Sequence, residues 1–224
     1  MSEFILTFDT AMSACSASVA RGAVVLARRF EIMERGQAEA LVPMIADVLA
    51  EAGLGAEDIG LIVTTLGPGA FTGVRIGIAT AQGLALARGV PVLGLTTLEA
   101  VAAANRPAGP LLVVLETKRS DYYVQLFGAG GDLAAAPRAM DHAAIRDALP
   151  DDTTAAVGDG ADRLIAALGE DGARLRRLDG ADVADAAVLA AMAAQRLSSG
   201  ADPACFPPLR PLYLRPPDVR APGR

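Results

Sequence analysis

The segment of this 224-residue chain best suited to chemistry is a glycine-rich turn between an apolar strand and an apolar helix. It reads Leu66-Gly67-Pro68-Gly69-Ala70-Phe71-Thr72-Gly73-Val74-Arg75-Ile76-Gly77. Glycines allow positive φ angles and the close approach of another backbone, and a helix start offers unpaired N–H groups that attract anions. Two interpretations therefore stay open: a turn that faces an anion, and a tight turn whose role is packing.

Two common nucleotide motifs are excluded by the spacing of this turn. A P-loop requires a lysine directly after its last glycine, whereas Val74 and Arg75 follow Gly73. In a dinucleotide fingerprint the third glycine would come one residue earlier. The next predicted strand also ends in Thr96 and Thr97, without the acid that would hold a ribose.

Three acids lie where a predicted strand ends or between two glycines. Asp9 and Glu116 each follow an apolar strand, and Asp159 lies between Gly158 and Gly160. A carboxylate at a strand end can hold Mg²⁺ through water. The alternative interpretation of each is an acid that shapes a turn, and this alternative is strongest for Asp159.

Hydrolytic and zinc chemistry lack the residues that they need. Catalytic zinc usually has three protein ligands, often several of them histidines, and His142 is the only histidine of the chain. No Gly-x-Ser-x-Gly turn is present, and His142 would be the only available base. Cys15 and Cys205 are far apart and are expected to be free thiols. The sequence predicts neither a metal site nor a catalytic residue.

The overall charge argues against independent binding to nucleic acid. The formal net charge is −6, and neutralised phosphates supply most of such affinity. A proline-rich C-terminal stretch does carry Arg210, Arg215, Arg220 and Arg224, which is either a solvated tail or a binding arm. No apolar run could span a bilayer and the first residues do not resemble a signal peptide, so a cytoplasmic protein without a membrane contact is expected.

The order of predicted elements repeats once along the chain. Strands are expected at 4–9, 14–20, 23–30, 59–66 and 90–95, and again at 111–116, 122–127 and 155–158. Helices are expected at 37–52, 74–87, 98–104 with Thr97 as the cap, 141–149, 162–168 and 184–197, followed by an extended segment at 203–217. We interpret each half as three strands, a helix and a strand, although no range is assigned to the third strand of the second half. This order predicts an internal duplication with a break near residues 106–110.

This duplicated plan is that of the actin-like ATPase (ASKHA) superfamily, an α/β fold of two ribonuclease-H-like lobes with mixed sheets and flanking helices. The resemblance implies an N-terminal lobe at residues 1–106 and a reduced C-terminal lobe with a proline-rich tail at 107–224. In that superfamily, acid-bearing turns from both halves face a nucleotide in a central cleft. Asp9, Glu116 and Asp159 stand at the corresponding positions of this chain.

Several motifs closely resemble one family, the TsaB (YeaZ) proteins. The residues that carry the resemblance are Phe8-Asp9-Thr10-Ala11, Ala14-Cys15-Ser16, Gly36-Gln37-Ala38-Glu39, the run from Gly67 to Gly77, Gly83-Leu84-Ala85 and Tyr213-Leu214-Arg215. The resemblance covers most of the first half and the C-terminal tip, and the run from Gly67 to Gly77 is its most specific part.

The resemblance implies a non-catalytic accessory subunit for making threonylcarbamoyladenosine in the anticodon loop of tRNA. Its partners would be a TsaD-type catalytic homologue, which binds the metal and transfers the threonylcarbamoyl group, and a TsaE-type ATPase. No tightly bound cofactor is expected, since ATP, ADP and metal would belong to these partners. Contact with tRNA would come through the complex, and the isolated chain could form a homodimer.

Site roles follow from the same resemblance. The signature-loop residues Gly67, Pro68, Gly69, Phe71, Thr72, Gly73 and Arg75 would shape the partner interface, with Arg75 as the polar anchor. Asp9, Glu116 and Asp159 would be vestigial nucleotide-side acids, and Arg215 and Arg220 candidate contacts to tRNA or a partner. The helix at 76–86 is apolar nearly all round, so it is expected to be buried on more than one side. The second side could be covered by a partner or by a neighbouring helix of the same chain. The alternative function is a stand-alone small-molecule kinase of the same fold.

Overall fold

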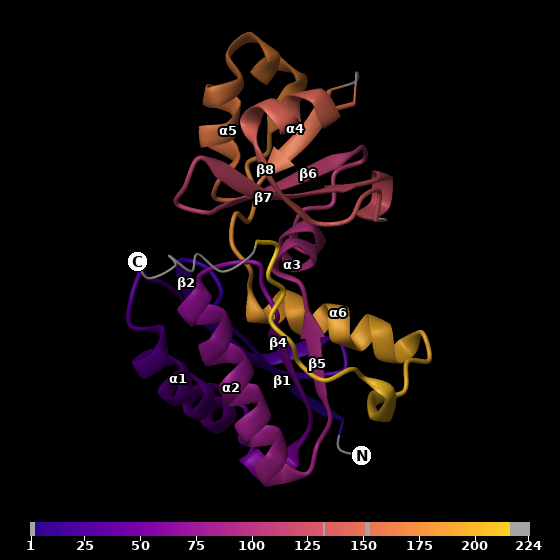
Figure 1. Cartoon of the computed structure of the whole chain (residues 1–224). Helices are drawn as coiled ribbons and strands as arrows, with labels where there is room; N and C mark the ends of the chain where they lie inside the picture. Colours follow the sequence, from indigo (N-terminus) through magenta and orange to yellow (C-terminus); the bar gives the residue numbers. More distant parts are fainter. Residues whose placement is uncertain (1–2, 132, 151–152, 216–224) are drawn as a thin grey trace, which may run out of the picture.

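The computed structural model describes residues 3–131, 133–150 and 153–215 and consists of two stacked lobes (Figure 1). The first sheet has the order β3-β2-β1-β4-β5, and the second has the order β10-β9-β6-β7-β8. The strands of the first sheet are β1 (Phe4–Asp9), β2 (Ala14–Arg21), β3 (Val24–Ile32), β4 (Ile59–Thr65) and β5 (Val92–Leu95). Those of the second are β6 (Leu111–Glu116), β7 (Asp121–Phe127), β8 (Arg138–Asp141), β9 (Thr154–Val157) and β10 (Leu175–Arg177).

The two sheets share one topology, which confirms the predicted duplication. In the first sheet β1 pairs antiparallel with β2 and parallel with β4. In the second sheet β6 pairs antiparallel with β7 and parallel with β9 in the same way. The carboxyl ends of β1 and β6 are therefore equivalent positions, and they carry Asp9 and Glu116.

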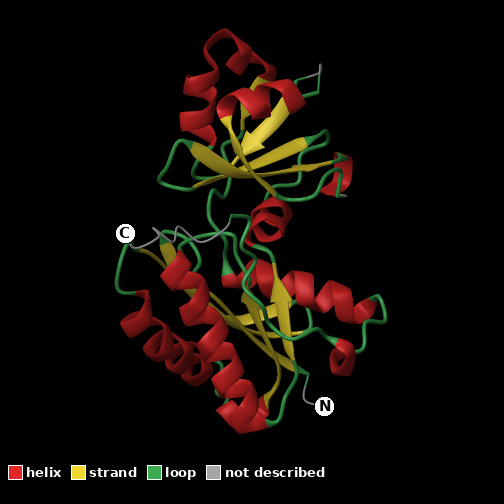
Figure 2. Ribbon diagram, in the orientation of Figure 1, coloured by secondary structure: helices red, strands yellow, loops and turns green. Residues whose placement is uncertain are grey.

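Helices cover both sheets, as the ribbon coloured by secondary structure shows (Figure 2). They are α1 (Gln37–Glu51), α2 (Phe71–Arg88), α3 (Thr97–Ala104), α4 (His142–Ala148), α5 (Ala161–Leu168) and α6 (Ala186–Ser198). Leu6 and Phe8 of β1 share a core with α1 and α2, whereas Ile5 shares a core with α6. Because alternate strand residues point to opposite faces, α6 covers the face of the first sheet that α1 and α2 leave open.

Helix α6 connects the two halves of the chain. It follows the second sheet in sequence but packs on the first, so that Leu189 joins a core containing Ile5, Leu93 and Val113. Thr7 Oγ1 in β1 donates a 2.6 Å hydrogen bond to the carbonyl of Ala186, at the start of α6. The last strand of the first sheet ends at Leu95 and the second sheet begins at Leu111. The assignment of lobes to 1–106 and 107–224 stays a prediction.

Most predicted elements agree with the structure, and the differences have physical causes. Strands β8 and β10 were not predicted because each is short and carries charged side chains at an edge of the sheet, without apolar alternation. The predicted cap of α3 was wrong by one residue. Thr96 is the N-cap: its Oγ1 accepts from the backbone of Glu99, whose carboxylate accepts from the Thr96 N–H, and Thr97 is buried.

Both cysteines are free thiols, as predicted, with Cys15 buried and Cys205 exposed. No helix in the described part of the chain has the length and apolarity needed to cross a membrane.

Candidate functional site

A cavity of about 1010 Å³ lies at the junction of the lobes and collects most of the predicted site residues. Its walls come from the turn after β1, the start of α1, the start of α2, the turn after β6 and the C-terminal segment. The lining includes Ala11, Met12, Ser13, Arg35, Gln37, Gly69, Phe71, Thr72, Gly73, Arg75, Glu116, Lys118, Arg119, Asp159, Tyr213 and Arg215. We refer to this cavity as the interlobe cleft.

The glycines of the signature loop have a packing cause. Helix α2 begins directly on the backbone of the turn after β1: Ala70 N–H donates to the Ala11 carbonyl at 2.7 Å, and Thr10 Oγ1 donates to the Gly73 carbonyl at 2.7 Å. A Cβ atom at Gly69 would collide with the Ala11 carbonyl, and one at Gly73 would collide with the Thr10 carbonyl. Only glycine allows the two backbones to approach this closely.

The same loop binds two further segments of the chain. Gly67 has φ 94°, in the left-handed region, and precedes a cis peptide bond to Pro68. Its carbonyl accepts from the Thr97 N–H of α3 at 2.9 Å, and the neighbouring Leu66 carbonyl accepts from Leu212 N–H at 2.8 Å. The loop thus joins β1, α3 and the C-terminal segment at one edge of the interlobe cleft.

Three planar side chains meet at the mouth of the interlobe cleft. The guanidinium carbon of Arg75 lies 3.2 Å from the ring centroid of Phe71 and 5.3 Å from that of Tyr213. The two rings are stacked with centroids 5.9 Å apart and planes inclined by 25°. We call these three residues the aromatic stack. The sequence marked Phe71 and Arg75 as site residues, and it had no local signal that would join them to Tyr213.

Asp9 is fully buried and does not line the interlobe cleft. Its carboxylate accepts hydrogen bonds from Thr65 Oγ1 and from Ala11 N–H, the latter at 3.3 Å. Burial raises the pKa of Asp9 to about 6, and the nearby charge of Asp185 adds to this, despite the opposing effect of the hydrogen bonds. The backbone of Ala11 lies on the cleft side, so Asp9 fits a structural acid better than a ligand of Mg²⁺.

We expect Asp9→Asn to stabilise the chain at neutral pH. The folded-state pKa is raised from 3.8 to about 6, so the stability that neutral Asp9 supplies below pH 4 is lost as the pH rises through 6. A shift of this size corresponds to about 3 kcal/mol, and asparagine avoids the loss. Urea unfolding between pH 4 and 7.5 should show a stability difference between variant and wild type that grows with pH.

The exposed acid Asp47 provides the control for this experiment, since Asp47→Asn should change stability little at any pH. If the difference in unfolding free energy between Asp9→Asn and wild type stayed constant with pH, burial would not raise the pKa of Asp9.

Glu116 and Asp159 do line the interlobe cleft, and both carboxylates already have partners within the chain. The Glu116 carboxylate forms a bidentate ion pair with Arg163 at 2.6 and 2.7 Å, and the Glu116 N–H donates to Asp159 at 2.8 Å. Burial and, to a smaller extent, the charge of Glu116 together raise the pKa of Asp159 to about 6. Within the described residues no group of three His, Cys, Asp or Glu side chains is arranged to hold a metal ion.

The two C-terminal arginines predicted to contact tRNA or a partner, Arg215 and Arg220, have different outcomes. Arg215 extends from the C-terminal segment to the second lobe, where it forms an ion pair with Asp121. Arg220 lies outside the described residues. The guanidinium of Arg215 therefore helps to hold the C-terminal segment across the interlobe cleft.

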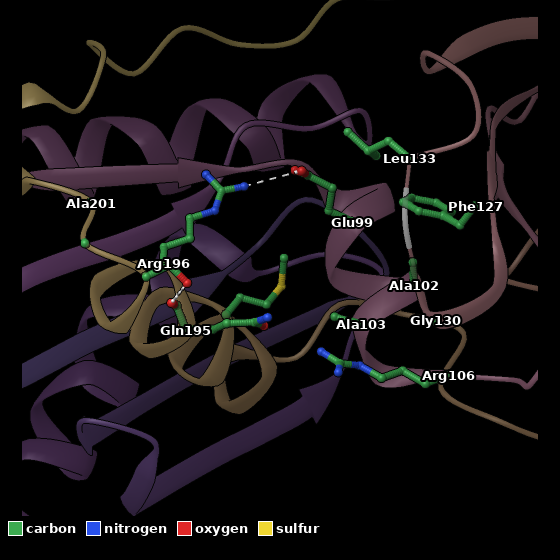
Figure 3. Close-up of a pocket in the computed structure, with 13 residues that line it drawn as sticks. Glu99, Ala102, Ala103, Arg106, Phe127, Gly130, Leu133, Gln195, Arg196 and Ala201 are labelled. Carbon is green, nitrogen blue, oxygen red and sulfur yellow. Dashed lines mark hydrogen bonds and ion pairs between the residues drawn. The ribbon is translucent and has the colours of Figure 1, made fainter.

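A second cavity, of about 620 Å³, lies between α3, α6 and the segment that follows β7 (Figure 3). Arg196 reaches across it to Glu99 at 3.4 Å, and Glu99 also forms the capping box of α3. These polar groups hold the two helices together. The interlobe cleft, which collects the signature loop and two of the three predicted acids, is therefore the better candidate for a functional site.

A comparison with protein families gives one match over more than half of the chain. The family model described as "TsaD: tRNA N6-adenosine threonylcarbamoyltransferase" matches residues 31–163. This range contains α1, the signature loop and both turns that carry Glu116 and Asp159.

Curated relatives match over about half of the chain or less. The Escherichia coli "tRNA threonylcarbamoyladenosine biosynthesis protein TsaB" is 43% identical over 98 residues, which are 44% of this chain and 42% of that protein. A "tRNA N6-adenosine threonylcarbamoyltransferase" of Novosphingobium aromaticivorans is 45% identical over 82 residues, or 37% of this chain and 23% of that enzyme. The chain spans about half the length, or less, of the curated relatives that it matches.

A solved structure matches nearly the whole chain. YeaZ from Pseudomonas aeruginosa superposes with a TM-score of 0.78 at 26% sequence identity, covering 96% of this chain and all of the other. Together with the two sheets of shared topology, this likeness confirms the predicted duplicated ribonuclease-H-like fold.

Proposed function

Since the chain belongs to the family of the tRNA N6-adenosine threonylcarbamoyltransferase model and is one of its TsaB (YeaZ) members, we propose that it is a non-catalytic accessory subunit in this modification of tRNA. It would activate a TsaD-type homologue, which would hold the metal and transfer the threonylcarbamoyl group to the tRNA adenosine. A TsaE-type ATPase would be the third subunit, and tRNA would be contacted through the complex.

The observation that carries this proposal is the exposed apolar surface of α1 and α2, which lie side by side on the outside of the first lobe (Figure 1). Val42 of α1 is 60% exposed and Leu86 of α2 is 87% exposed. Ala46 and Ala79 of the same helices are exposed as well. We call these four residues the helical face. Exposed apolar side chains on two neighbouring helices favour a protein interface.

The opposite sides of both helices are filled by the core of the first lobe. Leu41, Ile45 and Val48 of α1 and Val74 and Ile78 of α2 are buried there. Helix α2 therefore has one side covered by its own chain and an apolar side left open. We propose that the TsaD-type partner covers this open side, and that in its absence the helical face pairs with a second copy through a two-fold axis.

The geometry disfavours the alternative, a small-molecule kinase. Such an enzyme needs carboxylates that can reach a nucleotide-bound metal ion in the cleft. Asp9 is buried behind the Ala11 backbone, and Glu116 is neutralised by Arg163. Asp159 is the one predicted acid left in the cleft, and it already accepts a hydrogen bond from the Glu116 N–H. We therefore assign ATP, ADP and metal to the partner subunits.

The proposal is tested by mixing the purified chain with the TsaD-type protein of the same organism. Size-exclusion chromatography with light scattering should show a complex of the two proteins, replacing any homodimer of this chain. A TsaD-type protein that elutes unchanged at micromolar concentrations of both would contradict the proposal.

A further inference from the structure

The aromatic stack leaves ring surface open where the interlobe cleft meets solvent. Phe71 is 62% exposed and Tyr213 is 49% exposed, although both are large apolar rings. Arg75 packs on Phe71, so the rings are held in place from one side while much of their surface stays free. Rigid exposed rings of this kind can stack on another planar group at a low cost in conformational entropy.

Cationic side chains line the same cavity. Arg35 and Lys118 make no ion pair with any residue of the described chain, and Arg119 adds a further positive charge. Lys118 has φ 57° and is the one non-glycine residue with a positive φ in the described part. Its N–H donates to the Glu116 carboxylate at 2.6 Å, which fixes the turn that presents the lysine.

The acids of the cleft offset these charges only in part. Glu116 is neutralised by Arg163, whereas Asp159, with a pKa of about 6, stays largely ionised at neutral pH and offsets one positive charge. Glu34 and Glu39 remain as exposed acids at the rim. The interlobe cleft therefore combines stacked rings with a local excess of positive charge in a chain whose net charge is −6.

We propose that the aromatic stack and its neighbouring cations bind a nucleotide of an unpaired RNA segment. The base would stack on Tyr213 and Phe71, and the phosphates on either side would lie against Arg35 and Lys118. The exposed rings and the cations together favour RNA over an acidic peptide. The carboxylates of such a peptide would pair with the cations but would not stack on the rings. This inference rests on the proposed function, in which a tRNA is the substrate of the assembly.

The probe is a fluorescently labelled RNA hairpin with an unpaired loop, in the sequence of a tRNA anticodon arm. Binding to the full chain is measured by fluorescence polarisation at low salt. Tyr213→Ala should weaken binding about 5- to 100-fold, whereas Tyr213→Phe, which keeps the ring, should bind like wild type. Lys118→Ala should weaken binding less than Tyr213→Ala does. It should also reduce the slope of log affinity against log salt concentration by about one, and Lys118→Arg should keep the wild-type affinity and slope.

Controls separate this site from general electrostatic attraction. Leu133→Ala, at an exposed residue of the second cavity, should bind RNA like wild type. A fully paired RNA duplex should bind without any dependence on Tyr213. Equal binding of the hairpin by wild type and Tyr213→Ala would overturn the proposal, as would equally effective competition by polyglutamate.

Failure of this inference is distinguishable from failure of the proposed function. If Tyr213 has no effect on RNA binding while the chain still binds the TsaD-type protein, only the RNA site is wrong. If the chain binds the hairpin through Tyr213 but not the TsaD-type protein, the accessory role is wrong. Tyr213 is half-exposed, so thermal melting of Tyr213→Ala should match wild type and exclude misfolding.

Discussion

Gly73→Ala is expected to destabilise the chain by about 3 kcal/mol or more, and Gly83→Ala, in the same helix, to stabilise it by roughly 0.5–1 kcal/mol. The two glycines differ in what surrounds them. A Cβ at Gly73 would overlap the carbonyl oxygen of Thr10, which is backbone and has no alternative rotamer. A Cβ at Gly83 would have no atom within 4 Å.

The cost at Gly73 comes from moving the start of α2 away from the turn after β1. Such a movement would lengthen the bonds from Thr10 Oγ1 to the Gly73 carbonyl and from Ala70 N–H to the Ala11 carbonyl. It would also open the wall in front of Asp9, whose carboxylate depends on the Ala11 N–H. A single methyl group therefore disturbs several contacts at once.

Both variants are measured by urea unfolding monitored by circular dichroism, at one protein concentration. A Gly73→Ala chain as stable as wild type would mean that the signature glycines do not serve backbone packing. An unfolded Gly73→Ala chain agrees with the account only if Gly83→Ala is folded under the same conditions.

Leu86→Glu and Val42→Glu are each expected to weaken binding of a TsaD-type partner at least about 100-fold. Truncating a side chain at the centre of an interface commonly costs 2 kcal/mol or more, and burying an unpaired carboxylate adds to this cost. Both side chains are largely exposed in the isolated chain, so the substitutions should leave folding intact.

Leu133→Glu is the matched control for these substitutions. Leu133 is 65% exposed, comparable to Val42 at 60%, and it bridges to Phe127 of the second lobe, away from the helical face. Isothermal titration of each variant with the TsaD-type protein gives the comparison. Wild-type affinity in both helical-face variants, or an equal loss in Leu133→Glu, would exclude α1 and α2 as the interface.

The fold was predictable because its signals are local. Apolar strands such as residues 59–65 and the amphipathic helix α1 have clear periodicity, and their repeated order indicated the duplication. The close approach that the glycine spacing suggested is also what Gly69 and Gly73 provide in the structure. Edge strands β8 and β10 lacked such a signal, since their charged side chains face solvent.

The site was less predictable because its contacts join residues far apart in the sequence. Nothing near Glu116 indicates that Arg163 will neutralise it, and nothing near Phe71 indicates that Tyr213 will stack on it. Burial of Asp9 depends on how α2 packs on the turn after β1. The residue types were visible in the sequence, but their partners depended on the tertiary fold.

The most direct test of the accessory role is the transfer of the threonylcarbamoyl group to tRNA by the TsaD-type and TsaE-type proteins of the organism, with and without this chain. We predict transfer only when the chain is present and none from the chain alone, with the Leu86→Glu variant failing to support it. Equal transfer in its absence would contradict the account.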